Sequence, residues 1–133
     1  MADITDKWGE LVAERGFAQV PNYLMLINGF LDEDSRLTPV ELLVLLQLVG
    51  AWWQKDNPPF PSMATLAVRV GASERQVQRA VTRLVKDNLL RKVKRRAKGI
   101  IASNAYDLTP LVETLNEIAR RFPNQFPRAI AQR

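Results

Sequence analysis

The chain of 133 residues contains no cysteine and no histidine. The absence of cysteine excludes disulfides and thiolate chemistry, and it fits a reducing compartment. The absence of histidine removes the commonest protein metal ligand and the usual general base near neutral pH. No nucleophile–base pair stands out among the remaining residues. We therefore expect a protein that is not an enzyme, with no catalytic residue, no metal site and no cofactor.

Long apolar runs are also scarce. The most extended one, residues 42–53, is interrupted by Gln47 and falls well short of the ~20 apolar residues that a membrane-spanning helix needs. The N-terminal residues lack the charge pattern and the cleavage site of a signal peptide. The composition, with 47% hydrophobic and 25% charged residues, is that of a globular protein, and the length allows one hydrophobic core. We therefore expect a cytoplasmic protein without a membrane partner.

Acidic residues are rare in one region, between Arg69 and Lys98. There, eleven basic residues are accompanied only by Glu74 and Asp87, whereas the rest of the chain holds eight basic and twelve acidic residues. The overall net charge of +5 is therefore strongly segregated. Segregated positive charge indicates a polyanionic partner. The basic region has no bulky apolar face for lipid, which favours nucleic acid over a membrane surface.

The stretch from Ser73 to Asn88 predicts an amphipathic helix. Apolar residues recur at the spacing of one helical stripe, namely Val77, Ala80, Val81, Leu84 and Val85. The opposite face carries Arg75, Arg79, Thr82 and Lys86, flanked by Gln78 and Arg83. Ser73 is placed as the N-cap, and Gln76 completes a capping box. Taken alone, such a helix is more often a solvated basic surface than a DNA contact.

The neighbouring segments change that interpretation. Residues 38–54 predict a largely buried helix, because Thr38, Pro39 and Glu41 form a start signal ahead of a nearly continuous apolar run. Residues 60–70 predict a short helix capped by Ser62, and a turn that contains Gly71 joins it to the helix at 73–88. Residues 89–108 predict a β-hairpin with a basic loop at 97–99. Helix, turn, helix and hairpin follow one another directly.

The segment MATLAVRVGASERQVQRAVTRL resembles the helix-turn-helix of bacterial DNA-binding proteins. This resemblance is carried by the small Ala67, the turn residue Gly71 and the apolar positions Leu66, Val70, Val77 and Ala80. With the hairpin as a wing, the stretch is similar to the winged helix modules of plasmid and phage replication initiators and related mobile-element proteins. The fold that this resemblance implies is mainly α with a small β-hairpin wing, a winged helix-turn-helix.

In such a fold the second helix of the motif enters the major groove of double-stranded DNA, and the wing contacts the backbone or the minor groove. We expect Arg75 and Arg79 to bind guanine, and Gln76 and Gln78 to read adenine. The remaining expected contacts on the recognition helix (73–88) are Ser73 to phosphate, Thr82 and Arg83 to bases or phosphates, and Lys86 to phosphate. In the wing (91–101) the expected contacts are Lys92, Lys94, Arg95, Arg96 and Lys98, which supply mainly sequence-independent affinity.

The biological role stays open between three alternatives. The resemblance favours replication initiation or control in a plasmid, phage or other mobile element, in the bacterial cytoplasm at the nucleoid or a plasmid. A dimeric transcriptional regulator has the same kind of domain, and some winged helices bind proteins instead. A homodimer, further domains and replication proteins are the partners, besides double-stranded DNA, that these alternatives imply.

We divide the chain into four parts. Residues 1–30 are expected to form an N-terminal helix and a short strand at 17–20, which serve packing or dimerisation. Residues 31–108 are the expected winged helix DNA-binding domain. Residues 109–122 are expected to form a C-terminal helix, and residues 123–133 a tail or linker. The N-terminal helix is predicted from the spacing of Ile4, Trp8, Leu11 and Val12. Thr109, Pro110 and Glu113 predict the start of the last helix, with Thr109 as its cap. Trp52 and Trp53 could stack on bases, but at the end of a buried helix they are expected in the core.

Overall fold

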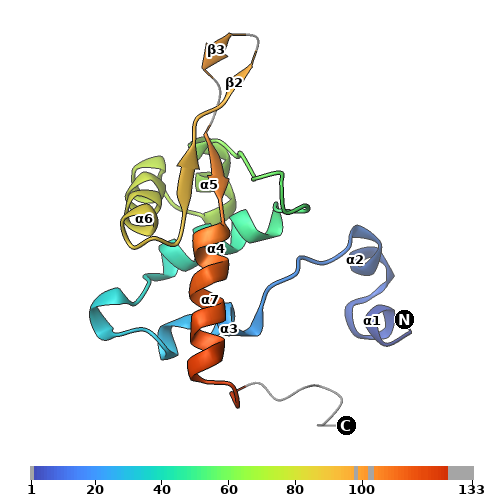
Figure 1. The fold of residues 1–133 in the computed structure, drawn as a ribbon. Helices are drawn as coiled ribbons and strands as arrows, with labels where there is room; N and C mark the ends of the chain where they lie inside the picture. The colour runs from blue at the N-terminus through green and yellow to red at the C-terminus, as the bar shows by residue number, and fades with distance from the viewer. Residues whose placement is uncertain (1, 98, 102–103, 126–133) are drawn as a thin grey trace.

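The computed structural model describes residues 2–97, 99–101 and 104–125 (Figure 1). The helices are α1 (Ala2–Trp8), α2 (Glu10–Arg15), α3 (Asn22–Met25), α4 (Pro39–Gly50), α5 (Met63–Val70), α6 (Glu74–Lys86) and α7 (Thr109–Arg121), with 3-10 turns η1 (Ile27–Gly29) and η2 (Glu33–Ser35). The strands are β1 (Arg91–Val93), β2 (Arg96–Ala97), β3 (Ile100–Ile101) and β4 (Ala105–Asp107). None of these helices combines the length and the apolar character that crossing a membrane would require.

Helix α4 forms the centre of the core. Its start is the predicted capping box: the Thr38 backbone N–H donates to Glu41 Oε1 at 2.8 Å, and the Glu41 backbone N–H donates to Thr38 Oγ1 at 3.2 Å. Val44, Leu45 and Leu48 are completely buried, and α4 packs against both α5 and α6. The prediction of a largely buried helix is confirmed, although α4 ends at Gly50, four residues earlier than expected.

Helices α5 and α6 form the predicted helix-turn-helix unit. Ser62 Oγ caps α5 by accepting from the Thr65 backbone N–H at 3.0 Å. Gly71 ends α5 with φ of 77°, a left-handed conformation that glycine adopts without steric cost, and so turns the chain toward α6. Ser73 and Gln76 then form the expected capping box of α6. The apolar stripe of α6 is buried as predicted, with Val77 and Leu84 fully enclosed.

A β-hairpin follows α6. Strands β1 and β4 pair in antiparallel register, with Arg91 opposite Asp107, and β2 pairs with β3 nearer the tip. At the base, the Tyr106 backbone N–H donates to the Pro59 carbonyl at 2.8 Å, which ties the hairpin to the segment before α5. The hairpin projects beyond the helices (Figure 1). The fold is therefore mainly helical with a β-hairpin wing, and the predicted winged helix-turn-helix is confirmed.

Helix α7 and the segment before α4 belong to the same core. Leu111 and Ile118 of α7, together with Leu24 and Ile27, join the cluster of buried side chains around α4. The Tyr23 hydroxyl donates to the Phe122 carbonyl at 2.6 Å, so the end of α7 is held against α3. The core is thus formed by elements from both sides of the helix-turn-helix.

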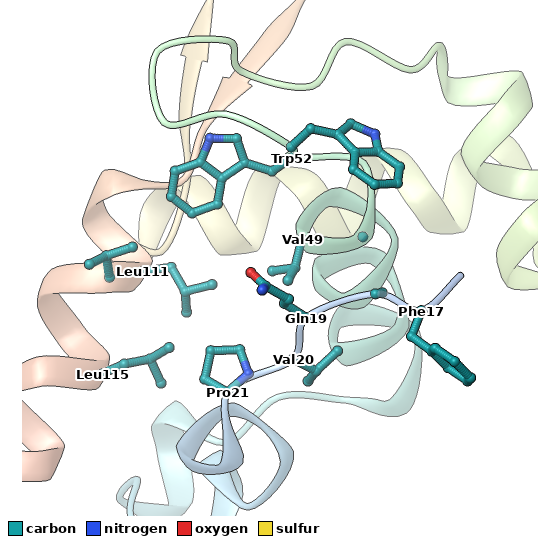
Figure 2. A pocket seen from close by; sticks show the side chains of 12 residues that line it. Phe17, Gln19, Val20, Pro21, Val49, Trp52, Leu111 and Leu115 are labelled. Atoms are coloured by element: carbon teal, nitrogen blue, oxygen red, sulfur yellow. The ribbon is translucent and has the colours of Figure 1, made fainter. Parts of the chain in front are cut away.

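The N-terminal region differs from the prediction. The expected single helix is two short ones, because Gly9 has φ of 86° and interrupts the helical path between Trp8 and Leu11. The expected strand at 17–20 is wrong within the described residues: this segment is extended but passes beside helix α4, where no strand edge is available to pair with it (Figure 2). A side-chain carbon on Gly50 would lie 3.6 Å from the Ala18 Cβ, which shows how closely the segment runs along α4.

Two further expectations are wrong. Trp53 is 84% exposed and only Trp52 is half-buried, because α4 ends before them and the two side chains no longer follow one helical face. Thr109 does not cap α7; its backbone N–H instead donates to Asp107 Oδ1 at 2.9 Å. The expected tail lies largely outside the described residues, which end at Gln125.

Candidate nucleic-acid interface

The exposed face of α6 is a basic surface. Six of the predicted contact residues line one shallow depression of about 490 Å³, namely Arg75, Gln78, Arg79, Thr82, Arg83 and Lys86. All of them except the partly buried Arg83 are exposed. No ion pair in the described part of the chain involves Arg75, Arg79 or Lys86. Their charge is therefore available to an anionic ligand.

The start of α6 is occupied by its own cap. Gln76 Oε1 accepts from the Ser73 backbone N–H at 2.9 Å, and Ser73 Oγ accepts from the Gln76 backbone N–H at 3.1 Å. Both side chains are exposed. Reading adenine with a glutamine amide uses its oxygen and its nitrogen together. Gln76 would have to leave the capping box to do so, whereas Gln78 would not.

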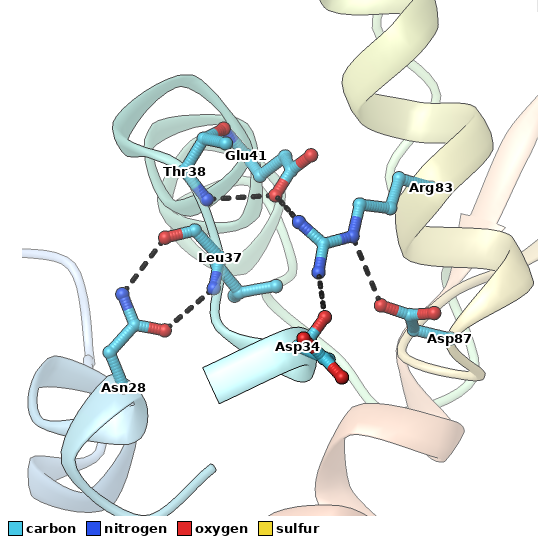
Figure 3. Close-up of polar contacts among 7 residues, drawn as sticks. All are labelled: Asn28, Asp34, Leu37, Thr38, Glu41, Arg83 and Asp87. Carbon is cyan, nitrogen blue, oxygen red and sulfur yellow. Dashed lines mark hydrogen bonds and ion pairs between the residues drawn. The ribbon is translucent and has the colours of Figure 1, made fainter. Parts of the chain in front are cut away.

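Arg83 forms hydrogen bonds and ion pairs with other residues of the protein (Figure 3). Its guanidinium donates to Glu41 Oε1 at 2.9 Å, to the Asp34 carbonyl at 3.0 Å and to Asp87 Oδ2 at 3.2 Å. Only 28% of the side chain is exposed. A guanidinium held by three acceptors positions α6 against α4, so Arg83 has a structural role, and its expected DNA contact stays a prediction.

Glu41 and Asn28 extend this arrangement at the start of α4 (Figure 3). Glu41 Oε1 receives hydrogen bonds from both the Thr38 backbone N–H and Arg83, so one atom caps α4 and holds α6. Asn28 donates to the Leu37 carbonyl at 2.9 Å and accepts from the Leu37 backbone N–H at 2.7 Å. The linking role of Glu41 was missed in the sequence, where its only signal is a local capping pattern.

The wing carries basic residues in different environments. Lys92 and Lys94 are exposed. Arg95 instead lies over the ring of Phe60, with its guanidinium carbon 3.7 Å from the ring centroid. Lys98 lies outside the described residues, and for Arg96 only the strand position of its backbone is described. Lys92 and Lys94 are thus the described wing cations best placed to meet a phosphate backbone.

The base of the wing is held by Asp107. Its Oδ2 accepts from Arg91 Nε at 3.1 Å, and Arg91 also forms an ion pair with it. Burial alone would raise the pKa of Asp107, but the hydrogen bonds from Thr109 and Arg91 outweigh it and hold this pKa below its ordinary value. Burial also raises the pKa of the neighbouring Tyr106. Asp107 is therefore an ionised anchor that joins β1, β4 and the start of α7.

Phe60 was not predicted as a site residue, but it supports the wing through Arg95. We expect Phe60→Leu to weaken binding to every duplex by about two- to fivefold, because an exposed cation–π contact is worth ~0.5–1 kcal/mol. Fluorescence anisotropy with two unrelated duplexes measures this. Arg95→Lys keeps the charge but loses the planar stacking group, and it should give a similar loss. Unchanged affinity in Phe60→Leu would show that the stack does not support DNA binding.

Comparison with known proteins agrees with this geometry. Residues 35–90 match a family model described as a helix-turn-helix domain. This stretch of the chain is similar to that family, and α5 and α6 have the helix-turn-helix arrangement. The match covers α4, α5 and α6 and ends before the wing. The hairpin is therefore seen in the structure but is not part of the matched region. No curated protein matched the chain. A helix-turn-helix domain indicates DNA binding, and the match includes Arg75 and Arg79 on the exposed face of α6.

Proposed function

We propose that the protein binds double-stranded DNA sequence-specifically, with the exposed face of α6 in the major groove and the wing along the backbone or minor groove. The observation that carries this proposal is the contrast along α6. Arg83 is neutralised by acceptors of its own chain, whereas Arg75, Arg79 and Lys86 face solvent without an ion pair in the described region. Removing water from such cations costs free energy unless an anion, such as a DNA phosphate, takes the place of the water.

The positions of these residues suggest a division of tasks. Arg75 and Arg79 lie one turn apart near the start of α6, where a recognition helix approaches the base edges, and each fits bidentate binding to guanine. Gln78, on the same surface, fits adenine. Thr82 and Lys86 lie further along α6, toward the phosphates. Lys92 and Lys94 add affinity that is independent of sequence.

For the biological role we propose replication initiation or control of a plasmid, phage or related element in the bacterial cytoplasm, with no catalytic step by this chain. A dimeric transcriptional regulator is the second candidate. It is favoured by the exposed apolar side chains of α1 and α2, which are typical of a surface that meets a partner. Both roles require the same DNA-binding face and differ in the arrangement of the target sites.

Selection of bound duplexes from a random pool tests the proposal. We expect an enriched sequence bound about 10³-fold or more tightly than random duplex, and an affinity that falls steeply with salt. Spaced direct repeats among the selected sites would support an initiator, and one inverted repeat would support a dimeric regulator. No enrichment together with no salt-dependent binding would contradict the proposal and favour a protein-binding module.

A further inference from the structure

The two N-terminal helices form an apolar arm that the rest of the protein leaves uncovered. We call residues 2–17, with α1 and α2, the arm. Leu11 is 78% exposed and Trp8 53% exposed, and α2 has no buried residue. The main contacts of the arm are internal: α1 packs on α2, and the rings of Trp8 and Phe17 lie 6.0 Å apart. In Figure 1 the arm stands to one side of the helical body, joined to it by an extended segment.

The body has an apolar surface beside the point where the arm joins it. A groove of about 680 Å³ lies between the end of α4 and α7 (Figure 2). The residues that line it on the side of α4 and α7 include Val49, Trp52, Trp53, Leu111, Val112 and Leu115. Phe17, the last residue of the arm, and residues 18–21, which join the arm to the body, line it on the other side. Two smaller depressions adjoin it and share the exposed Trp53. We call this continuous area the Trp53 surface.

The charges of the arm and the Trp53 surface are complementary. Four acidic residues of the arm, Asp3, Asp6, Glu10 and Glu14, outnumber its two basic residues, Lys7 and Arg15. The charged residues that line the Trp53 surface are Lys55 and Arg69, both basic, and no acidic residue lines it in the described part of the chain. An acidic amphipathic helix pair therefore matches an apolar surface with basic edges.

We propose that two copies of the chain associate by exchanging arms, so that the arm of each copy covers the Trp53 surface of the other. Such an exchange is symmetric and closed, and it gives each protomer two contacts from one set of residues. A buried aromatic side chain contributes ~150–250 Å². The exposed parts of Trp8 and Trp53, together with exposed aliphatic side chains such as Leu11, can therefore supply much of the ~800 Å² per partner of a stable interface.

This dimer is compatible with DNA binding but does not depend on it. The exposed face of α6 contributes no residue to the Trp53 surface, and in Figure 1 α6 lies on the side of the body opposite the arm. Both recognition helices therefore remain exposed after the exchange. The association is measured without DNA, so its outcome is separate from that of the proposed function.

Sedimentation of the full chain over a range of concentrations tests the exchange. We expect the wild type to reach twice the monomer mass of 15.1 kDa. Leu11→Glu and Trp53→Glu should each weaken dimerisation by about 100-fold, because each change removes a large apolar contact at two symmetric places. Both side chains are exposed, so the variants should fold normally. Val68→Glu is the matched control: Val68 is 82% exposed but lies outside the Trp53 surface, and its dimer should persist.

Mixing the two deficient variants tests the arm-to-surface contact itself. Leu11→Glu keeps an intact Trp53 surface and Trp53→Glu keeps an intact arm, so the mixture should form a heterodimer through one remaining contact. A dimer that forms arm to arm would not be rescued in this way, and that result would overturn the proposal. A monomeric wild type would also overturn it. The difference in acrylamide quenching between the wild type and Trp53→Phe, which separates Trp53 from Trp8 and Trp52, would then show whether the arm closes on its own chain or leaves the surface open to another protein.

Discussion

Arg79→Ala is expected to lower the affinity for the selected duplex by about 5- to 150-fold, the equivalent of ~1–3 kcal/mol for one bidentate guanine contact. Arg79 is exposed in the middle of the basic face of α6 and takes part in no ion pair in the described region. The substitution removes its contact without disturbing the core, because the residues that α6 buries are Val77, Ala80, Val81 and Leu84. Affinity for random duplex should change much less than affinity for the selected one.

Lys94→Ala is the matched control for this experiment. Lys94 is exposed in the wing, where contact is expected with phosphates and not with bases. It should weaken binding to both duplexes alike and reduce the slope of log affinity against log salt by about one unit. Competition binding at several salt concentrations distinguishes the two variants. Equal losses on selected and random duplex for Arg79→Ala would contradict its assignment to base recognition.

The second large effect concerns stability. Glu41→Ala should lower the free energy of unfolding by about 2–4 kcal/mol, because it removes half of a capping box and leaves Arg83 partly buried without its main carboxylate. Glu41 is only 7% exposed, so in the variant water has little access to the groups that lose their hydrogen-bond acceptor. Denaturant unfolding followed by circular dichroism measures the difference.

Glu41→Gln separates the two contributions of this residue. A glutamine side chain can still accept from the Thr38 backbone N–H, so the cap is retained while the charge opposite Arg83 is lost. We expect a loss about half that of Glu41→Ala. If Glu41→Ala changed stability by less than ~0.5 kcal/mol, as surface substitutions usually do, the link between α4 and α6 would be energetically unimportant.

The features that were correctly predicted depend on interactions between near neighbours in the chain. The capping boxes of α4 and α6 join residues three positions apart, and the buried stripe of α6 follows from helical spacing. Gly71 occupies the left-handed position that a turn between two helices needs. The prediction of a strand at 17–20 was wrong because its local pattern has no neighbouring strand in the fold to pair with. Residues 17–20 have strand-like composition, but they run beside a helix.

The sequence alone determined the amphipathic, basic character of the helix from Ser73 to Asn88, because spacing decides which side chains share a face. It also determined the order of helix, turn, helix and hairpin. Spacing does not decide which distant group a side chain meets. Arg83 and Glu41 are 42 residues apart, and only the packing of α6 on α4 brings them together. The tertiary structure therefore gives Arg83 acceptors within the protein and leaves Arg75, Arg79 and Lys86 exposed without an ion pair in the described region. The tertiary structure also decides that Trp53 is exposed and Trp52 half-buried, because the end of α4 relative to α7 determines which of the two tryptophans packs against the protein.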